Sequence, residues 1–191
     1  MDSLRLFIAL ETPAPVKERV LEVIETLRSS HADVHWEPGA NLHSTVKFLG
    51  PTSPDLAAVL TETLGAIGRQ HPPLSLSYQS IGFFPNARSA RVIWIGILDP
   101  DDGLHNLQRA IDLGVAPLGF ATETREFHPH LTLGRIRSSR NLHQLIATTE
   151  TLTFSTALYT FNTLSLLRSD LRPSGSVYTQ EKSFPLIGKP R

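Results

Sequence analysis

The sequence contains no cysteine among its 191 residues, which excludes a disulfide framework, a thiolate zinc site and a cysteine nucleophile. It also lacks any run close to the roughly 18 apolar residues that a membrane-spanning helix requires. Its first residues, Met1 to Arg5, show neither the cationic start nor the apolar run of a secretory signal. We therefore expect a cytoplasmic protein without a membrane partner.

The sequence has no excess of charge of either sign, because 18 Lys and Arg residues balance 18 Asp and Glu residues. A protein that wraps a long nucleic acid must neutralise many phosphates, so this balance argues against that class of binder. A site that grips one or two terminal phosphates stays open. Arg125, Arg135, Arg137 and Arg140 gather within one short segment beside two histidines. Such a cluster forms either a solvated basic face or part of an anion site.

Strand-like and helix-like hydrophobic patterns follow one another along the whole chain. The expected strands are residues 4–10, 34–36, 42–48, 74–82, 90–98, 130–136, 152–154, 160–168 and 176–184, and the expected helices are about 15–29, 54–69, 102–117 and 139–147. A turn at 173–175 joins the last two strands as a hairpin. Strands mixed with a few helices and hairpins favour an α+β protein with mainly antiparallel sheets. We find no linker, so residues 1–191 are expected to form one domain, of one body or two closely joined lobes.

Two His-x-Thr motifs give the chain a weak internal repeat. Each half carries a strand, a helix, and a strand with such a motif, and residues 42–50 and 129–136 match best. Side chains at positions i and i+2 of a strand point to the same face, about 6–7 Å apart along the strand. Each motif therefore presents an imidazole and a hydroxyl on one face of its strand.

The paired motifs, His43-x-Thr45 and His130-x-Thr132, suit a phosphate if their two strands flank a groove. The hydroxyls donate to phosphate oxygens, while one imidazole removes a proton and the other supplies one. A single His-x-Thr is a weak motif that arises by chance, and histidines on strands are more often structural than catalytic. From these residues alone, both interpretations stay open.

Six segments raise the specificity well above that of either motif. They are Arg5-Leu-Phe-Ile-Ala-Leu10, His43-Ser-Thr-Val-Lys-Phe-Leu-Gly50, Ile81-Gly-Phe-Phe-Pro-Asn-Ala-Arg88, Arg91-Val-Ile-Trp-Ile-Gly96, His128-Pro-His-Leu-Thr-Leu-Gly-Arg135 and Leu171-Arg-Pro-Ser-Gly-Ser-Val-Tyr178. In order and spacing they resemble the 2H phosphoesterases, specifically the RNA 2′,3′-cyclic phosphodiesterases, once called 2′-5′ RNA ligases (LigT-like). The resemblance covers nearly the whole chain. Its one visible departure is Gly134, where many relatives have alanine.

The resemblance implies a fold of two similar lobes of mainly antiparallel sheet, with flanking helices, around a central groove. One His-x-Thr strand would come from each lobe, within a single bilobed domain. Carried over by position, His43 would be the catalytic acid and His130 the base. Thr45 and Thr132 would hold the phosphate, and Arg135 would stabilise the negative charge of the transition state. A surface salt bridge is the alternative role for this arginine.

The resemblance also implies the reaction. A monomer without metal or cofactor would hydrolyse 2′,3′-cyclic phosphate ends of RNA, tRNA fragments among them, to 2′-phosphates. In reverse, the same groups would join such an end to a 5′-hydroxyl in a 2′-5′ linkage. Phe48, together with Phe83 and Phe84, is a candidate for stacking a base, although core packing is the common role of phenylalanine.

Several alternatives remain at this point. A zinc site of His43, His128 and His130 is disfavoured because no further ligand has a supporting spacing. His128 would share the face of His130 only if the strand begins before Pro129. The chain could also be a ligase by physiological role, a phosphodiesterase of a small cyclic-phosphate metabolite, or a non-catalytic module that binds RNA ends.

Overall fold

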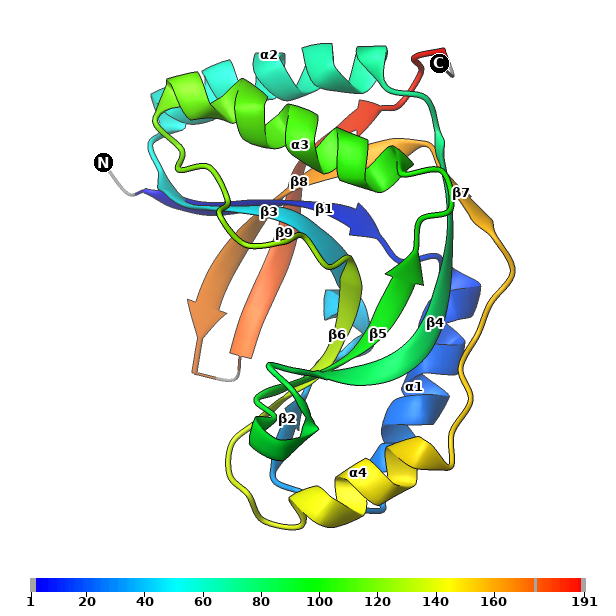
Figure 1. The fold of residues 1–191 in the computed structure, drawn as a ribbon. Helices are drawn as coiled ribbons and strands as arrows, with labels where there is room; N and C mark the ends of the chain where they lie inside the picture. The colour runs from blue at the N-terminus through cyan, green and yellow to red at the C-terminus, as the bar shows by residue number, and fades with distance from the viewer. Residues whose placement is uncertain (1–2, 174, 190–191) are drawn as a thin grey trace.

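The computed structural model describes residues 3–173 and 175–189, which form two antiparallel sheets and four α-helices (Figure 1). The first sheet has the order β3-β1-β8-β9, with β3 at His43–Thr52, β1 at Leu4–Glu11, β8 at Thr163–Arg172 and β9 at Gly175–Pro185. The second has the order β2-β6-β5-β4-β7, with β2 at Val34–Trp36, β6 at His130–Ile136, β5 at Val92–Leu98, β4 at Leu74–Phe84 and β7 at Tyr159–Phe161. The α+β class expected from the sequence is confirmed.

The four described α-helices pack in two pairs at opposite ends of the molecule. They are α1 at Ala14–Arg28, α2 at Pro54–Gln70, α3 at Gly103–Val115 and α4 at Leu142–Glu150. Helix α3 follows a strand of the second sheet but packs with α2 on the first sheet, where it contacts β3. Helix α1 follows a strand of the first sheet but packs with α4 at the other end of the molecule. Each lobe therefore takes elements from both halves of the chain. No helix in the described part of the chain is both long and apolar enough to cross a membrane.

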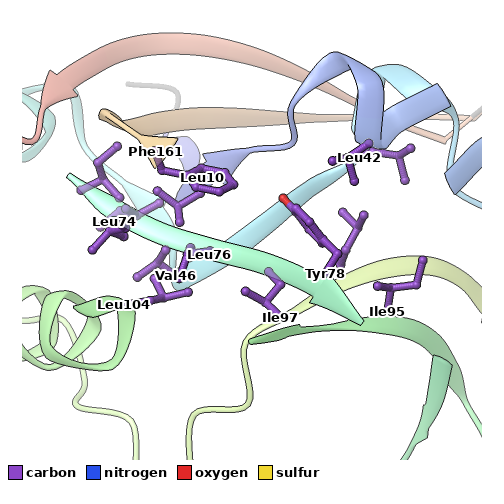
Figure 2. Close-up of a cluster of buried hydrophobic side chains, with 14 of the residues drawn as sticks. Leu10, Leu42, Val46, Leu74, Leu76, Tyr78, Ile95, Ile97, Leu104 and Phe161 are labelled. Atoms are coloured by element: carbon purple, nitrogen blue, oxygen red, sulfur yellow. The ribbon is translucent and has the colours of Figure 1, made fainter. Parts of the chain in front are cut away.

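One continuous apolar cluster fills the space between the sheets (Figure 2). Leu10 and Val46 of the first sheet meet Leu76 and Ile95 of the second sheet there. The other face of β1 carries a smaller cluster that includes Phe7. Because β1 is buried on both faces, it reads in the sequence as an uninterrupted apolar run rather than an alternating one.

Two of the expected strands differ from the structure. Residues 152–154 are not a strand, and the run 160–168 is divided between β7 and β8, which belong to different sheets. The chain changes sheets at Asn162, whose carbonyl oxygen accepts from the backbone N–H of Leu186 at 2.8 Å. Hydrophobic pattern reports burial but not the partner strand, so this division leaves no signal in the sequence. Of the expected turn at 173–175, Ser174 lies outside the described residues.

Strand β3 is also longer than expected, because it continues through Gly50 and Pro51 to Thr52. It lies at the edge of its sheet, where a proline removes no ladder hydrogen bond. Gly50 has a φ of +74°, a left-handed conformation that glycine adopts without a steric penalty. Gly-Pro is therefore compatible with this edge strand, although the pair usually ends one.

Candidate active site

The two His-x-Thr strands lie in contact with one another although they belong to different sheets. Strand β3 is the edge of the first sheet, and β6 lies between β2 and β5 in the second. On each strand the histidine and threonine are half-buried, while the residues between and after them, such as Ser44 and Leu131, are buried on the opposite face. The alternation expected from the sequence is therefore present in both motifs.

His43 is held by hydrogen bonds at both ring nitrogens. Its Nδ1 donates to the carbonyl oxygen of Asn41 at 2.6 Å. Since a carbonyl only accepts, the proton of the neutral ring sits on Nδ1, and Nε2 accepts from Thr45 Oγ1 at 3.1 Å. The ring lies 4.9 Å from that of Phe7 and meets the ring of Tyr178 edge-on at 5.0 Å. The Nε2 lone pair of His43 and the hydroxyl of Thr45 therefore lie next to each other on the same face of β3.

His130 is held in a similar way by different neighbours. Its Nδ1 donates to the carbonyl oxygen of His128 at 2.7 Å, which leaves the lone pair of the neutral ring on Nε2. The ring of Phe84 meets it edge-on at 4.9 Å, and that of Trp94 lies 6.4 Å away. Because β6 begins at His130, His128 lies before the strand and does not share its face, and it bonds to His130 through its backbone carbonyl.

Burial shifts the protonation of both histidines in the same direction. Burial lowers the pKa of His43 to about 4, against the opposing effect of the Asn41 carbonyl. Burial likewise lowers the pKa of His130 below 6.5, against the opposing effect of the His128 carbonyl. Positive charge nearby acts with burial, from Lys17 on His43, from His128 on His130 and from Arg135 on both rings. Both imidazoles are therefore neutral near pH 7.

Arg135 is the charged group that the two motifs share. Its positive charge lowers the pKa of His43 and of His130, which places the guanidinium within electrostatic reach of both rings. Its Nε lies 3.7 Å from a carboxylate oxygen of Glu37, whose side chain is 12% exposed, whereas that of Arg135 is 58% exposed. The neighbouring Arg137 instead donates to His35 Nδ1 at 3.0 Å. Of the clustered arginines, Arg135 is thus the one linked to both histidines.

Phe48 lies on the same face of the first sheet as His43 and is 72% exposed. Strict alternation would place Lys47, not Phe48, on the face of His43 and Thr45. A bulge in the pairing with β1 inserts an extra residue between Thr45 and Lys47, and this turns Lys47 inward. Lys47 there forms a buried ion pair with Asp112. Phe48 is left outward, with its ring 6.2 Å from that of Phe7.

A second aromatic wall lies on the β6 side of the site. Trp94 is the cross-strand neighbour of Thr132, and its ring lies 4.9 Å from that of Phe84. A side chain at Gly82 would place its Cβ 2.3 Å from the indole, so glycine is required where Trp94 crosses β4. Sequence reasoning named Phe84 but missed Trp94 and Tyr178. Both lie within the segments that carry the family resemblance, but no pattern showed that they face the histidines.

Among the described residues, Asp99, Asp102 and His105 group their potential ligand atoms closely enough to hold a metal ion. Asp99 accepts from the backbone N–H groups of Leu104 and His105, and from His105 Nδ1 at 2.8 Å. These bonds satisfy two backbone N–H groups in the first turn of α3 and hold Asp99 beside His105. Neither motif histidine belongs to this group.

The family model of the 2′-5′ RNA ligase superfamily matches residues 13–173. The chain belongs to this superfamily. The resemblance seen in the sequence is thereby confirmed, and the departure at Gly134 has a local cause. A Cβ at this position would lie 2.6 Å from Val34 Cγ1 of β2, so glycine fits the close strand pairing of this member.

Curated members of the superfamily match over nearly their full length. The RNA 2′,3′-cyclic phosphodiesterase of Methanothermobacter thermautotrophicus is 32% identical over 185 residues, which cover 95% of this chain and 98% of that protein. The protein of the same name from Aquifex aeolicus is 28% identical over 191 residues, which cover 98% and 100%.

Solved structures share the fold. The Escherichia coli LigT structure complexed with 3′-AMP superposes with a TM-score of 0.75 and 28% identity, and covers 96% of this chain and 98% of its own. A Thermus thermophilus protein, TT0787, superposes with a TM-score of 0.81 at 24% identity, covering 97% and 99%. The second likeness concerns the fold alone. Together these matches confirm the architecture expected from the family resemblance.

Proposed function

We propose that this superfamily member hydrolyses 2′,3′-cyclic phosphate ends of RNA to 2′-phosphates with two histidines and without a metal ion. The observation that carries the proposal is the pair of neutral imidazoles on contacting strands, each with Nδ1 held by a backbone carbonyl, with Arg135 in electrostatic reach of both. The names of the relatives supply the reaction class, since they are RNA 2′,3′-cyclic phosphodiesterases.

In the proposed reaction, neutral His130 removes a proton from a water molecule that attacks phosphorus in line with the 3′ oxygen. The new bond from phosphorus to the water oxygen forms as the bond to the 3′ oxygen breaks. Protonated His43 gives its proton to that leaving oxygen, so the product carries a 2′-phosphate and a 3′-hydroxyl. With a 5′-hydroxyl in place of water as the nucleophile, the same step would form a 2′-5′ linkage and release the 3′-hydroxyl.

His43 needs a proton that its surroundings disfavour, because burial holds its pKa at about 4. A phosphate anion bound beside Nε2 would raise this pKa, because an opposite charge favours the charged form of a nearby group. The acid would therefore form together with the complex. Thr45 and Thr132 would donate to the phosphate oxygens, and Arg135 would leave Glu37 to offset the growing charge.

The exposed ring of Phe48 would stack the base of the RNA end, since its position beside Phe7 puts a flat apolar surface on the histidine face. We further propose that the chain acts as a monomer, in a single bilobed domain over residues 1–191, and that ends of tRNA fragments are among its substrates.

The test is to incubate the purified protein, with chelator present, with an RNA that ends in a 2′,3′-cyclic phosphate, and to identify the terminal group by mass spectrometry. We expect a 2′-phosphate, and a loss of rate of at least about a hundredfold in His43→Ala and in His130→Ala. His143→Ala, which removes an exposed histidine of α4, is the matched control and should keep the full rate.

Other outcomes would redirect the proposal. Loss of activity in chelator would restore a metal mechanism. No conversion of RNA, with turnover of a small cyclic phosphate that needs both histidines, would indicate a metabolite phosphodiesterase. RNA-end binding that persists in both alanine variants without any turnover in the parent would indicate a binding module.

A further inference from the structure

Asn41 links the turn before β3 to a distant hairpin. It closes the short 3₁₀ turn η1, Gly39–Asn41, immediately before the first motif strand, and only 9% of it is exposed. Its side-chain Nδ2 donates to the carbonyl oxygen of Ser176 at 2.9 Å, across 135 positions of sequence. Ser176 lies at the start of β9, just after the tip of the β8–β9 hairpin.

The same residue also holds the motif histidine. The backbone carbonyl of Asn41 is the acceptor for His43 Nδ1, at 2.6 Å. Tyr178, two residues after Ser176 on β9, packs its ring edge-on against the His43 imidazole at 5.0 Å. The β8–β9 hairpin therefore reaches His43 twice, directly through Tyr178 and indirectly through Asn41.

The hairpin tip is placed against the second sheet as well. A Cβ at Gly175 would lie 3.8 Å from His35 Nε2, and His35 belongs to β2. The turn η1 leaves β2 and enters β3, so it is the segment that passes from the second sheet to the first. Apart from the bond of the Asn41 side-chain amide, the described hydrogen bonds that hold this turn are local backbone ones. The N–H of Asn41 donates to the carbonyl oxygen of Pro38, and the N–H of Leu42 donates to that of Gly39.

We propose that Asn41 is a positioning residue, which fixes the tautomer and orientation of His43 by tying the η1 turn to the β8–β9 hairpin. This inference rests on the proposed function and adds a residue that controls one of its two histidines. A fixed carbonyl keeps the proton of the neutral ring on Nδ1 and directs Nε2 toward Thr45 and the phosphate. If the turn moves, the ring samples the other tautomer and other orientations, and fewer molecules are competent for proton transfer.

The experiment compares Asn41→Leu with Asn41→Asp. Both changes keep the approximate size of the side chain and remove the amide donor, but only the second adds a negative charge, which by itself favours protonated histidine. An effect that both variants share therefore reports the loss of the tether. Asn141→Asp is the matched control, because Asn141 Nδ2 makes the same kind of bond to the carbonyl of His31, at 3.1 Å, beside α4, and because aspartate tolerates the φ of +53° at this position.

The first readout is the ring ¹⁵N spectrum of His43, which distinguishes the Nδ1–H and Nε2–H tautomers without any need for turnover. We expect the parent protein and Asn141→Asp to show the Nδ1–H form alone, and both Asn41 variants to show a mixture. The second readout is a fall of about tenfold in kcat with KM nearly unchanged, the size expected from one lost hydrogen bond. Tautomer and kcat both at parent values in Asn41→Leu would overturn the proposal.

A variant that fails to fold would move the test to the parent protein. There the side-chain amide protons of Asn41 are expected to exchange slowly and to show a hydrogen-bond coupling to the Ser176 carbonyl, and free exchange would overturn the tether. The two proposals remain separable. A parent protein that turns over no cyclic phosphate, while its Asn41 variants change the His43 tautomer, would retain the positioning role and refute the proposed function.

Discussion

The two His-x-Thr strands have the same motif in unlike surroundings. Strand β3 is at the edge of a four-stranded sheet, while β6 lies inside a five-stranded one. Asn41, Tyr178 and Phe7 surround His43, and burial takes its pKa down to about 4. Phe84 and Trp94 flank His130, whose pKa is also lowered by burial, but by less.

The difference extends to the threonines. Thr45 donates to His43 Nε2, whereas among the described residues Thr132 makes no side-chain hydrogen bond. Repetition of a three-residue motif thus supplies two similar groups, and the packing around each decides how readily it is charged. Paired titratable groups whose environments separate their pKa values are the usual basis for acid and base roles.

The largest expected effect comes from removing Arg135, whose charge acts on the histidines of both strands. Arg135→Ala should lower kcat/KM by about a hundredfold or more, since it removes a positive charge from the proposed phosphate site. It should also raise the pKa of both histidines, because that charge lowers them. Steady-state kinetics and NMR titration measure the two effects. Arg137→Ala is the control, since Arg137 is bonded to His35, and equal losses in the two variants would contradict the assignment.

The pH dependence of kcat/KM tests the pKa values of the two histidines and has the next largest expected effect. The active form pairs a neutral base with a protonated acid, so the rate rises through the lower of the two pKa values and falls through the higher. Burial places both values below the ordinary 6.5. We therefore expect a bell with its maximum below pH 6.5, and a kcat profile displaced to higher pH by the bound phosphate. A maximum of kcat/KM above pH 7 would contradict the effect of burial.

Removal of the exposed Phe48 ring tests whether β3 also binds a base of the substrate. Phe48→Ala should raise KM for an RNA end by about tenfold, the effect of losing one stacked base, and leave kcat nearly unchanged. Leu113→Ala is the control, because Leu113 is also an exposed apolar side chain but lies on α3. An unchanged KM would remove Phe48 from the binding surface.

The smallest effect expected is on stability. The folded pKa of His43 lies below its unfolded value of 6.5, so between about pH 6.5 and 4 the unfolded chain holds more protons. The free energy of unfolding should therefore fall as pH decreases through this window. His43→Asn should flatten that fall more than His130→Asn does, as measured by urea unfolding at several pH values. Equal slopes in the two variants would show that burial of the two rings does not differ.

Much of the site could be predicted from sequence, because a strand has a period of two. That period places His43 with Thr45 and His130 with Thr132, whatever the rest of the fold. The position of Phe48 could not be derived in this way, since the bulge before Lys47 shifts the alternation by one residue. The separation of β7 from β8 was missed for a related reason, because hydrophobic pattern carries no record of which strand is the partner.

By itself the sequence determined the α+β class, the two motif faces and the family, since local periodicity and the order of short segments are properties of the chain. Only the tertiary structure decided that β3 and β6 meet, that the charge of Arg135 acts on both histidines, and that Ser176 reaches Asn41. It also decided the unequal pKa values of the two histidines. Burial and electrostatics depend on groups brought together from distant parts of the chain, and sequence spacing does not encode those distances.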